Sequence, residues 1–532
     1  EVILFTSLAV PVYLETLDYT VVATAQPTIA SHFNRLNLQS YIGTIYLLTS
    51  TVFLPLYASV ADIYGRHFTL QTSLLFFLVG SAISTGSFSM ITMLVGRGIA
   101  GIGAAGMLAL PRIILADSAS LAQQNVQISM LMILYAIGYV TGPIIGGALS
   151  SVSFRWIFAI NLPAALLAMI IAFFLLRGRS DYTRDMTDKR MQHVMSQSRI
   201  GKLASLDWIG TALFVAAGIL ILLALNWGST EKWSSVKVIV SFVVGGVLFL
   251  LCVGWEAFLQ ARQANRPTTR LWRMFPMLPI EVFSTLDSFA TQAVSFGAGL
   301  VMLVMFYYLA VFFVIVNGSS NTNAGVQLLY FAPGMGAGAF ISQAIIRRTK
   351  QPKYAVMAGT LITTVALGLV SQGVHTSSNG MVNGHVPTLF MAGTGVGLTL
   401  GPAGAHARFA QAVSRVAIVT SYLRFSQNLG GTVGLAQAAA VLNARVHSYI
   451  ASQVATGAIS PSDAAALQLS GSSLSSINAI NALPQGLNNI VKDAFRDGTR
   501  WLFISMIPWA GVCFLLSLFL ENISEHPPQE DR

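Results

Sequence analysis

Long runs of apolar residues, separated by short polar or basic segments, recur along the whole chain. A helix needs about 20 such residues to cross the hydrocarbon core of a bilayer. Only 9% of the 532 residues are charged, whereas about 25% are charged in a soluble globular protein. So few charges leave too little polar surface to cover a soluble fold of this length. The sequence therefore predicts an all-α polytopic membrane protein.

The apolar runs predict fourteen membrane-spanning helices. The runs near 386–406 and 416–443 are the least apolar, because Gly, Ala and polar residues are frequent in them. The predicted spans lie near 3–30, 40–61, 69–89, 91–111, 126–150, 156–176, 207–227, 236–258, 287–316, 324–346, 354–373, 386–406, 416–443 and 499–520.

Lys and Arg gather in alternate connections between the spans, above all in 177–206 and 260–273. Cytoplasmic connections of membrane proteins carry the excess of basic residues. These connections are therefore predicted to be cytoplasmic, and the even number of spans places both termini on the same side. Because topology explains the formal net charge of +10, that charge gives no reason to expect a nucleic-acid partner.

The two most basic connections divide the predicted spans into six, two and six. Spans seven and eight would form a hairpin inserted between two six-helix halves. Since the chain begins at Glu1 rather than Met, we also expect a preceding segment. The predicted units are an N-terminal half (1–176), a cytoplasmic linker (177–206), the hairpin (207–258), a basic cytoplasmic linker (259–286), a C-terminal half (287–520) with an outside loop (446–497), and a cytoplasmic tail (521–532).

The first span contains carboxylates in the stretch LETLDYTVVATAQP. A charge at the centre of a membrane helix costs about 2.5–3.5 kcal/mol, so such residues usually face a bundle interior or a watery cavity. Glu15, Asp18 and Gln26 fall on one side of the helix at 100° per residue. Span four offers Arg97 as a partner within MLVGRGIAGIGAAGM, whose glycines permit close helix packing. A carboxylate that changes its protonation beside this arginine would suffice for proton coupling, and the alternative is a static ion pair.

A glycine-rich face is expected in span five, where the chain reads YAIGYVTGPIIGGAL. Small residues at such spacing are common in packed membrane helices, so ordinary helix packing is the alternative to a functional role. The residues of this face are Gly138, Gly142, Pro143, Gly146 and Gly147.

Three further sites carry charge within or beside the spans. The short connection ASVADIYGRHFTL places Asp62, Gly65 and Arg66 where they would contact another helix end as a cytoplasmic gate, unless they only set topology. Asp287 in span nine and Arg424 in span thirteen are intramembrane ionisable residues, and both are candidates for a substrate cavity. Asp287 would alternatively sit near the cytoplasmic interface.

Together these stretches resemble the major facilitator superfamily, and specifically its fourteen-span drug:proton antiporter branch. LDYTVVATAQP resembles the branch's first-span motif LDxTVVNVALP, although Gln26 replaces the usual Leu. VADIYGRH is similar to the loop motif GxLaDrxGrr, RGIAGIGAA to the fourth-span motif RxxqGxgaA, and the run from Gly138 to Gly147 to the antiporter motif gxxxGPxxGG. The segments FRWIFAINLPAAL and LRFSQNLGGTVG also look like the family.

This resemblance implies a fold of two six-helix halves that rock around a site near the bilayer midplane. It implies proton-coupled efflux by alternating access, without a cofactor. It would give Asp18 the proton site, Arg97 the relay, Asp62 and Arg66 a gate, and span five the antiporter packing.

The leading function is a monomeric exporter of small organic compounds such as drugs or toxins. Glu15 and Asp18 would make an acidic cavity that favours cationic or amphipathic substrates. A vacuolar importer of basic amino acids and a non-transporting nutrient sensor are the alternatives, and the plasma membrane is favoured over the vacuolar membrane. An enzyme is disfavoured because no GxxxxGK[ST], HExxH or supported GxSxG motif occurs, and the scattered His residues indicate no metal site.

Overall fold

The computed structural model describes most of the chain, with gaps in the connections and in the fifth predicted span. Of 127–149 it describes only 127, 130–131, 133–135, 137–138, 141–142, 145–146 and 148–149. The other described residues are 2–35, 38, 41–118, 152–176, 199–230, 233–265, 274–278, 285–319, 327–328, 330–376, 386–411, 415–457, 459–460 and 484–523.

The described residues form helices, and an isolated bridge between Leu206 and Phe275 is the one strand-like pairing among them. One group of helices comprises α1 (Val2–His32), α2 (Tyr41–Val52), α3 (Leu54–Tyr64), α4 (Arg66–Thr85), α5 (Met90–Ser118), α7 (Phe154–Ala159) and α8 (Asn161–Leu176). A short helix α10 (Arg199–Leu203) precedes the pair α11 (Trp208–Thr230) and α12 (Val236–Asn265). The last group comprises α13 (Leu286–Ile315), α15 (Phe331–Thr349), α16 (Lys353–Thr376), α17 (Val386–Phe409), α18 (Val416–Ala455) and α21 (Gln485–Ser517).

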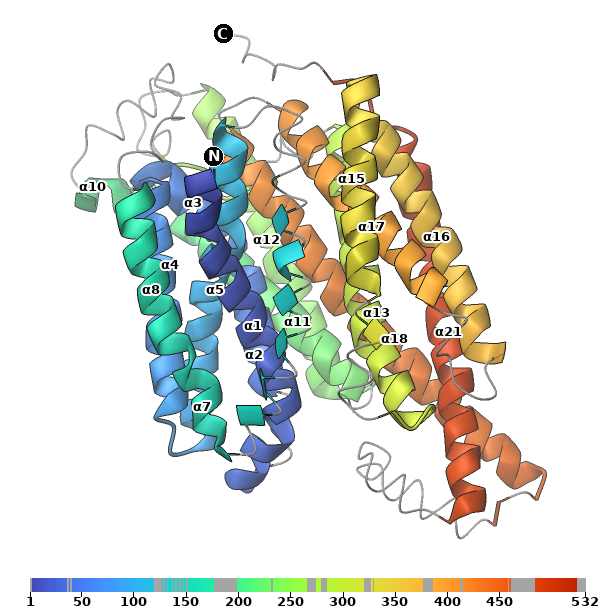
Figure 1. Ribbon diagram of the computed structural model, residues 1–532. Helices are drawn as coiled ribbons and strands as arrows, with labels where there is room; N and C mark the ends of the chain where they lie inside the picture. Colours follow the sequence, from blue (N-terminus) through green and yellow to red (C-terminus); the bar gives the residue numbers. More distant parts are fainter. Residues whose placement is uncertain are drawn as a thin grey trace.

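The two groups stand side by side, with α1–α8 on the left and α13–α21 on the right of Figure 1. Helices within each group pack mainly on one another, and α18 crosses between the groups to contact α3 and α5. The pair α11–α12 lies between them, and α11 contacts α2 and α18. The predicted six, two and six order and the unit boundaries stay predictions.

Most predicted spans coincide with a described helix. Among the described residues, eight helices are long and apolar enough to cross a membrane, or nine if the bent pair α2–α3 is one span. That pair bends by 44° near Phe53. Pro55 in the first turn of α3 explains the break, because proline has no N–H to continue the helical ladder. The protein is an integral multi-pass membrane protein, and the count of fourteen spans stays a prediction.

Helix burial separates lipid-facing from central helices. Only 22% of the most apolar stretch of α12 is buried, and side chains such as Val243 and Leu250 point outward. In α5, by contrast, 83% of the corresponding stretch is buried. A Cβ on Gly101 would lie 2.6 Å from the Tyr46 carbonyl oxygen, and one on Gly103 would lie 2.3 Å from the Phe77 nitrogen. The expectation that glycines bring this helix close to its neighbours is therefore confirmed.

The helices α18 and α21 extend into the predicted outside loop 446–497, which is a correction to its boundaries. Leu442, Val446 and Ile450 recur every four residues on the buried side of α18, so the helical pattern continues past the predicted span. They pack toward α21, whose Gly498 lies against Leu442. The middle of this loop lies outside the described residues, as do most of the linker 177–206 and most of the tail.

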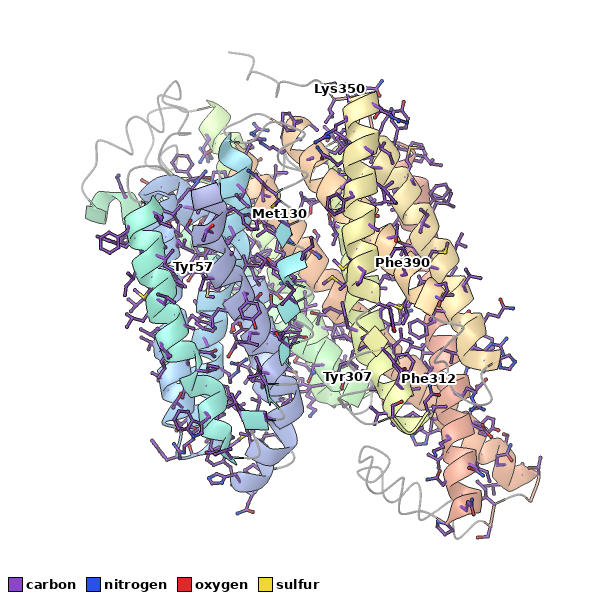
Figure 2. All side chains as sticks on the ribbon, viewed as in Figure 1. Tyr57, Met130, Tyr307, Phe312, Lys350 and Phe390 are labelled. Carbon is purple, nitrogen blue, oxygen red and sulfur yellow. The ribbon has the colours of Figure 1, made fainter. Side chains whose placement is uncertain are left out.

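The charged ends of the helices gather where the cytoplasm is predicted. Figure 2 labels Lys350, which follows α15, at the end of the molecule where the chain begins. Arg347 and Arg348 occupy the last turn of α15, where cations are stabilised by the helix dipole.

Candidate functional site

Asp18 and Arg97 form an ion pair between α1 and α5. The distance from Arg97 Nη1 to Asp18 Oδ2 is 2.7 Å. Asn161, at the start of α8, donates its amide N–H to Asp18 Oδ1 at 2.5 Å. The predicted ion pair is therefore present, and the carboxylate on α1 contacts side chains of α5 and α8.

Arg97 is also held by aromatic rings and a backbone carbonyl. Its guanidinium carbon lies 4.1 Å from the centre of the Tyr46 ring and 5.5 Å from that of Phe158. Its Nε donates to the Ile42 carbonyl oxygen at 3.3 Å. Cation–π contacts of this kind contribute about 2 kcal/mol when water is excluded. The arginine is thus fixed next to the carboxylate by more than charge.

The ion pair is dry in this conformation. The side chains of Asp18 and Arg97 are 0% and 1% exposed. Neither residue lines the cavities described below. The pair is therefore shielded from solvent unless the surrounding helices move.

The described part of the glycine face in span five packs against α1 beside Asp18. A Cβ on Gly138 would lie 2.8 Å from Thr16, and one on Gly142 would lie 1.8 Å from the Thr20 hydroxyl oxygen. Thr20 donates that hydroxyl to the Gly138 carbonyl oxygen at 3.1 Å. These glycines therefore allow span five to touch the helix that carries Asp18.

Of the remaining residues on that face, Gly146 belongs to the described residues, and Pro143 and Gly147 lie outside them.

A small cavity lies between the two groups of helices. Glu15 and Tyr19 of α1 line it together with Arg424, Gln427 and other side chains from α2, α5, α13 and α18. The volume of this cavity is about 20 Å³, which is room for about one water molecule. An organic substrate can enter this place only if the two groups separate.

Two of the four predicted cavity residues line this cavity, namely Glu15 and Arg424. Gln26 is half-buried and its amide lies against Gly43 of α2. The cavity thus holds one acidic and one basic residue, whereas the sequence had suggested two acidic ones. The difference arises because Asp18 lies 60° around the helix from Glu15, on the side away from Tyr19.

Asp287 lies elsewhere, which corrects its predicted place in the cavity. It begins α13 and accepts hydrogen bonds from His406 of α17 at 2.9 Å and from the backbone N–H of Glu521 at 2.9 Å. The latter residue follows α21, so the carboxylate ties the ends of three helices together. This position matches the alternative that Asp287 sits at the cytoplasmic end.

Sequence reasoning missed Arg112, which it assigned to a cytoplasmic connection. The structure extends α5 to Ser118, so Arg112 is buried within the bundle. Its Nη1 donates to Gln427 Oε1 of α18 at 3.3 Å. The apolar residues IILA that follow Arg112 are a signal that the helix continues. A second cavity, lined by Arg112, Gln427, Ser295, Thr420 and others, adjoins the first.

The predicted gate lies at the junction of α3 and α4. Arg66 Nη1 and Asp62 Oδ1 form an ion pair with an N–O distance of 2.5 Å. Gly65 between them has φ of +98° and ψ of 153°, a backbone conformation that residues other than glycine rarely adopt. Nearby, the hydroxyl of Ser421 in α18 donates to the Leu54 carbonyl oxygen at 2.8 Å. The first half of α18 therefore closes against α3 at this end.

The sequence of the chain is similar to those of known proteins. Residues 12–193 match the family model described as Major Facilitator Superfamily. The efflux pump FUS6 of Gibberella fujikuroi is 30% identical over 455 residues, which cover 84% of this chain and 76% of that protein. The acurin A biosynthesis cluster MFS-type transporter of Aspergillus aculeatus is 29% identical over 453 residues, which cover 85% of this chain and 76% of that protein.

The fold is also similar to solved structures. The crystal structure of the proton:xylose symporter XylE aligns with a TM-score of 0.59 at 11% identity, covering 99% of this chain and 97% of that chain. At this identity the likeness concerns the fold alone.

Proposed function

The chain belongs to the major facilitator superfamily and is a membrane transporter rather than an enzyme, and we propose that it exports small organic compounds from the cytosol in exchange for protons. The ion pair between Asp18 and Arg97 carries this proposal, because the Asp18 carboxylate is a titratable acid buried within one group of helices. The names of relatives support export, since FUS6 is an efflux pump and another relative belongs to a biosynthesis cluster.

Alternating access would move the substrate. The central cavity has room for about one water molecule and lies where α1, α2 and α5 meet α13 and α18. Separation of the two groups at one end and then at the other would open it to each side in turn. The contact of Ser421 with Leu54 is one that must break when the cytoplasmic end opens.

Coupling would follow from the state of Asp18. In this conformation Arg97 offers the carboxylate a positive charge, and Asn161 offers it a hydrogen-bond donor. Movement of α1 away from α5 would remove these partners and admit water, and the carboxylate would then take up a proton. Protonation would be favoured on the acidic side of the membrane and substrate binding on the other.

The energy available to such a cycle is sufficient for export. One proton falling through 100 mV releases about 2.3 kcal/mol, and one unit of pH adds about 1.4 kcal/mol. The sum of about 3.7 kcal/mol supports a substrate gradient of several hundred-fold. No nucleotide-driven step is required at this magnitude.

The test uses purified protein in liposomes with an imposed pH gradient and a panel of fluorescent xanthene dyes of either charge. We expect wild type to drive uphill dye movement that stops when an ionophore removes the gradient. In Asp18→Asn the Tyr46 and Phe158 rings and the Ile42 carbonyl oxygen still hold Arg97. This variant should lose uphill movement at least tenfold and keep dye-for-dye exchange, which needs no proton. Gradient-driven movement by Asp18→Asn at the wild-type rate would reject the role of Asp18.

We propose the plasma membrane as the site of action, because export to the medium requires it. A fluorescently tagged chain should coincide with a plasma-membrane marker in the source cells. Its accumulation on vacuoles would instead favour the importer of basic amino acids, and lysine uptake into isolated vacuoles would then be the relevant assay.

A further inference from the structure

Two buried arginines meet at the centre of the molecule, one from each group of helices. Arg112 of α5 and Arg424 of α18 are 9% and 5% exposed. Both donate to the same acceptor, Gln427 Oε1, at 3.3 and 2.9 Å respectively. Both also lie over the ring of Tyr135, with guanidinium carbons 5.7 and 5.0 Å from its centre. Such convergence of like charges in a low-dielectric interior is unfavourable unless something compensates for it.

The compensation within the described residues is incomplete. Neither arginine has a carboxylate within ion-pair distance among them. Glu15 lines the same cavity as Arg424, and its carboxylate accepts a hydrogen bond from the Thr16 hydroxyl. The other acid of α1, Asp18, is already paired with Arg97. Two positive charges therefore face one negative charge.

Hydrogen-bond donors are also left over. Among the described residues, no acceptor meets Arg112 Nε and Nη2, Arg424 Nε or Gln427 Nε2. A buried donor without a partner costs about 1–3 kcal/mol, and more when it is charged. Several such donors around two adjoining cavities are the arrangement expected of a site that awaits acceptor atoms.

Resting on the proposed export function, we propose that Arg112, Arg424 and Gln427 form the recognition site for an organic anion, so that the transported compounds are amphipathic carboxylates or phenolates. An arginine binds a carboxylate through two parallel N–H donors, which suits the leftover donors here. This assignment reverses the cationic preference that the sequence suggested.

The two cavities place the arginines in order along an export route. The cavity that holds Arg112 is lined by Thr420 and Ser295, which lie nearer the helix ends predicted to be cytoplasmic. The cavity that holds Arg424 is lined by Gly299 and Asn428, which lie deeper in the same helices. Gln427 lines both. An anion from the cytosol would meet Arg112 first and Arg424 second, with Gln427 in contact at each stage.

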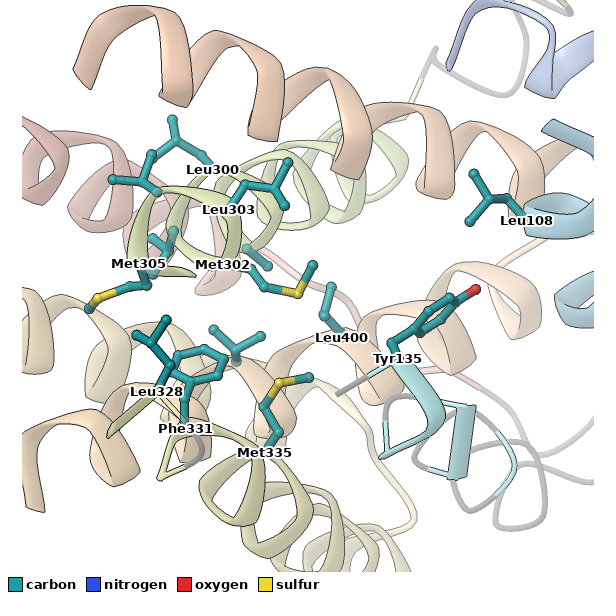
Figure 3. Close-up of a cluster of buried hydrophobic side chains, with 14 of the residues drawn as sticks. Leu108, Tyr135, Leu300, Met302, Leu303, Met305, Leu328, Phe331, Met335 and Leu400 are labelled. Carbon is teal, nitrogen blue, oxygen red and sulfur yellow. The ribbon is translucent and has the colours of Figure 1, made fainter. Parts of the chain in front are cut away.

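The apolar lining explains why the anion is amphipathic. Leu108, Met302 and Leu303 line the deeper cavity, and Leu400 lines the outer one. Figure 3 shows Leu108 facing this cluster from the side of the first group of helices. Methionine adapts its shape to different ligands. An aromatic or aliphatic body would pack here while its acidic group binds the arginines.

The competing role for these arginines is structural, as partners for Glu15 alone. The two roles differ in what happens when Glu15 is neutralised. If the arginines bind an anion, Glu15→Gln removes a repulsive charge and tightens anion binding. If they serve only to balance Glu15, the same change leaves anion binding absent and weakens the fold.

The experiment measures binding of matched dyes to the purified full chain by fluorescence anisotropy, without a pH gradient. The dyes are fluorescein, an anion, and rhodamine 123, a cation of similar shape in which the carboxylate is a methyl ester. We expect fluorescein to bind at least tenfold more tightly than rhodamine 123. Arg424→Gln and Arg112→Gln should each weaken fluorescein binding about tenfold, Arg424→Lys less, and Glu15→Gln should strengthen it.

Arg496→Gln is the matched control, because Arg496 pairs with Asp493 within α21, a helix that contributes no lining residue to either cavity. It should leave fluorescein binding unchanged. Equal or tighter binding of rhodamine 123, absence of fluorescein binding, or weaker fluorescein binding in Glu15→Gln would each overturn the proposal. If the arginine variants fail to fold, the dye preference of wild type and the Glu15→Gln result still decide. Binding without gradient-driven transport would contradict the proposed function and leave the anion site in place.

Discussion

At the scale of single residues, the account depends on which charges are paired and which are left facing the cavities. Asp18 has an arginine, an amide and two nearby aromatic rings around its pair. Glu15, three residues earlier, accepts a hydrogen bond from the Thr16 hydroxyl and lines the deeper cavity. The two carboxylates of one helix therefore have different tasks, in spite of their closeness in the sequence. We propose that Asp18 exchanges protons. We propose that the charge of Glu15 limits how tightly an anion is held.

Removal of Arg97 alone should be strongly destabilising. Arg97→Gln leaves the Asp18 carboxylate buried with only Asn161, and an uncompensated buried charge costs about 3–5 kcal/mol. The double variant Asp18→Asn with Arg97→Gln should recover most of this loss, because neither charge remains. Thermal unfolding in detergent measures both. A double variant no more stable than Arg97→Gln would show that the pair is not the source of the effect.

Gly65 is the residue whose backbone conformation most requires glycine. With φ of +98° and ψ of 153°, a Cβ would be strained by about 1–3 kcal/mol. Gly65→Ala should lower the melting temperature and slow transport, because the strain falls at the junction of α3 and α4 beside the pair of Asp62 and Arg66. Gly246→Ala is the control, since nothing lies within 4 Å of a Cβ there. Equal effects of the two changes would argue against a special role for Gly65.

At the scale of helices, close backbone contacts position the arginines. A Cβ on Gly299 of α13 would lie 1.9 Å from the Gln427 carbonyl oxygen, and one on Gly430 of α18 would lie 2.0 Å from that of Phe296. The backbones of α13 and α18 therefore touch at the level of the deeper cavity. This contact fixes the level in the bundle at which Arg424 and Gln427 lie in the proposed anion site.

Gly299→Ala should displace α18 and misalign the anion site. We expect fluorescein binding to weaken by several-fold, with a loss of stability of about 1–3 kcal/mol from overpacking. Gly254→Ala in α12 adds the same methyl group where no atom lies within 4 Å, and it should change neither quantity. Wild-type binding in Gly299→Ala would contradict the view that the α13–α18 contact sets the site.

Much of the helix pattern was predictable from the sequence, and less of the site was. Apolar runs of bilayer length are a direct physical requirement, so most predicted spans coincide with a described helix, although several helix ends differ. The pairing of Asp18 with Arg97 was also foreseeable, because a charge inside a membrane needs a partner. The cavity was not, since whether Asp18 or Glu15 faces it depends on the rotation of α1 by a few tens of degrees. Arg112 was missed because apolar length alone does not say where a helix ends.

At the scale of the whole molecule, the proposed alternating access requires that the contact between α3 and α18 open and close. We predict that cysteines introduced at Leu54 and Ser421, joined through two disulfides by a short bis-methanethiosulfonate reagent, will stop dye transport. Cleavage of the link by a reductant should restore it, and each single-cysteine variant treated in the same way should remain active. Full transport by the cross-linked protein would contradict rocking at this end.

The most direct test of the account follows proton movement itself. Liposomes that contain the purified chain and an internal pH-sensitive dye report whether an added organic anion makes protons cross the membrane. The account predicts that wild type moves protons when the substrate is added, and that Asp18→Asn exchanges substrate at a comparable rate with no proton signal. Substrate-dependent proton movement of wild-type size in Asp18→Asn would contradict it.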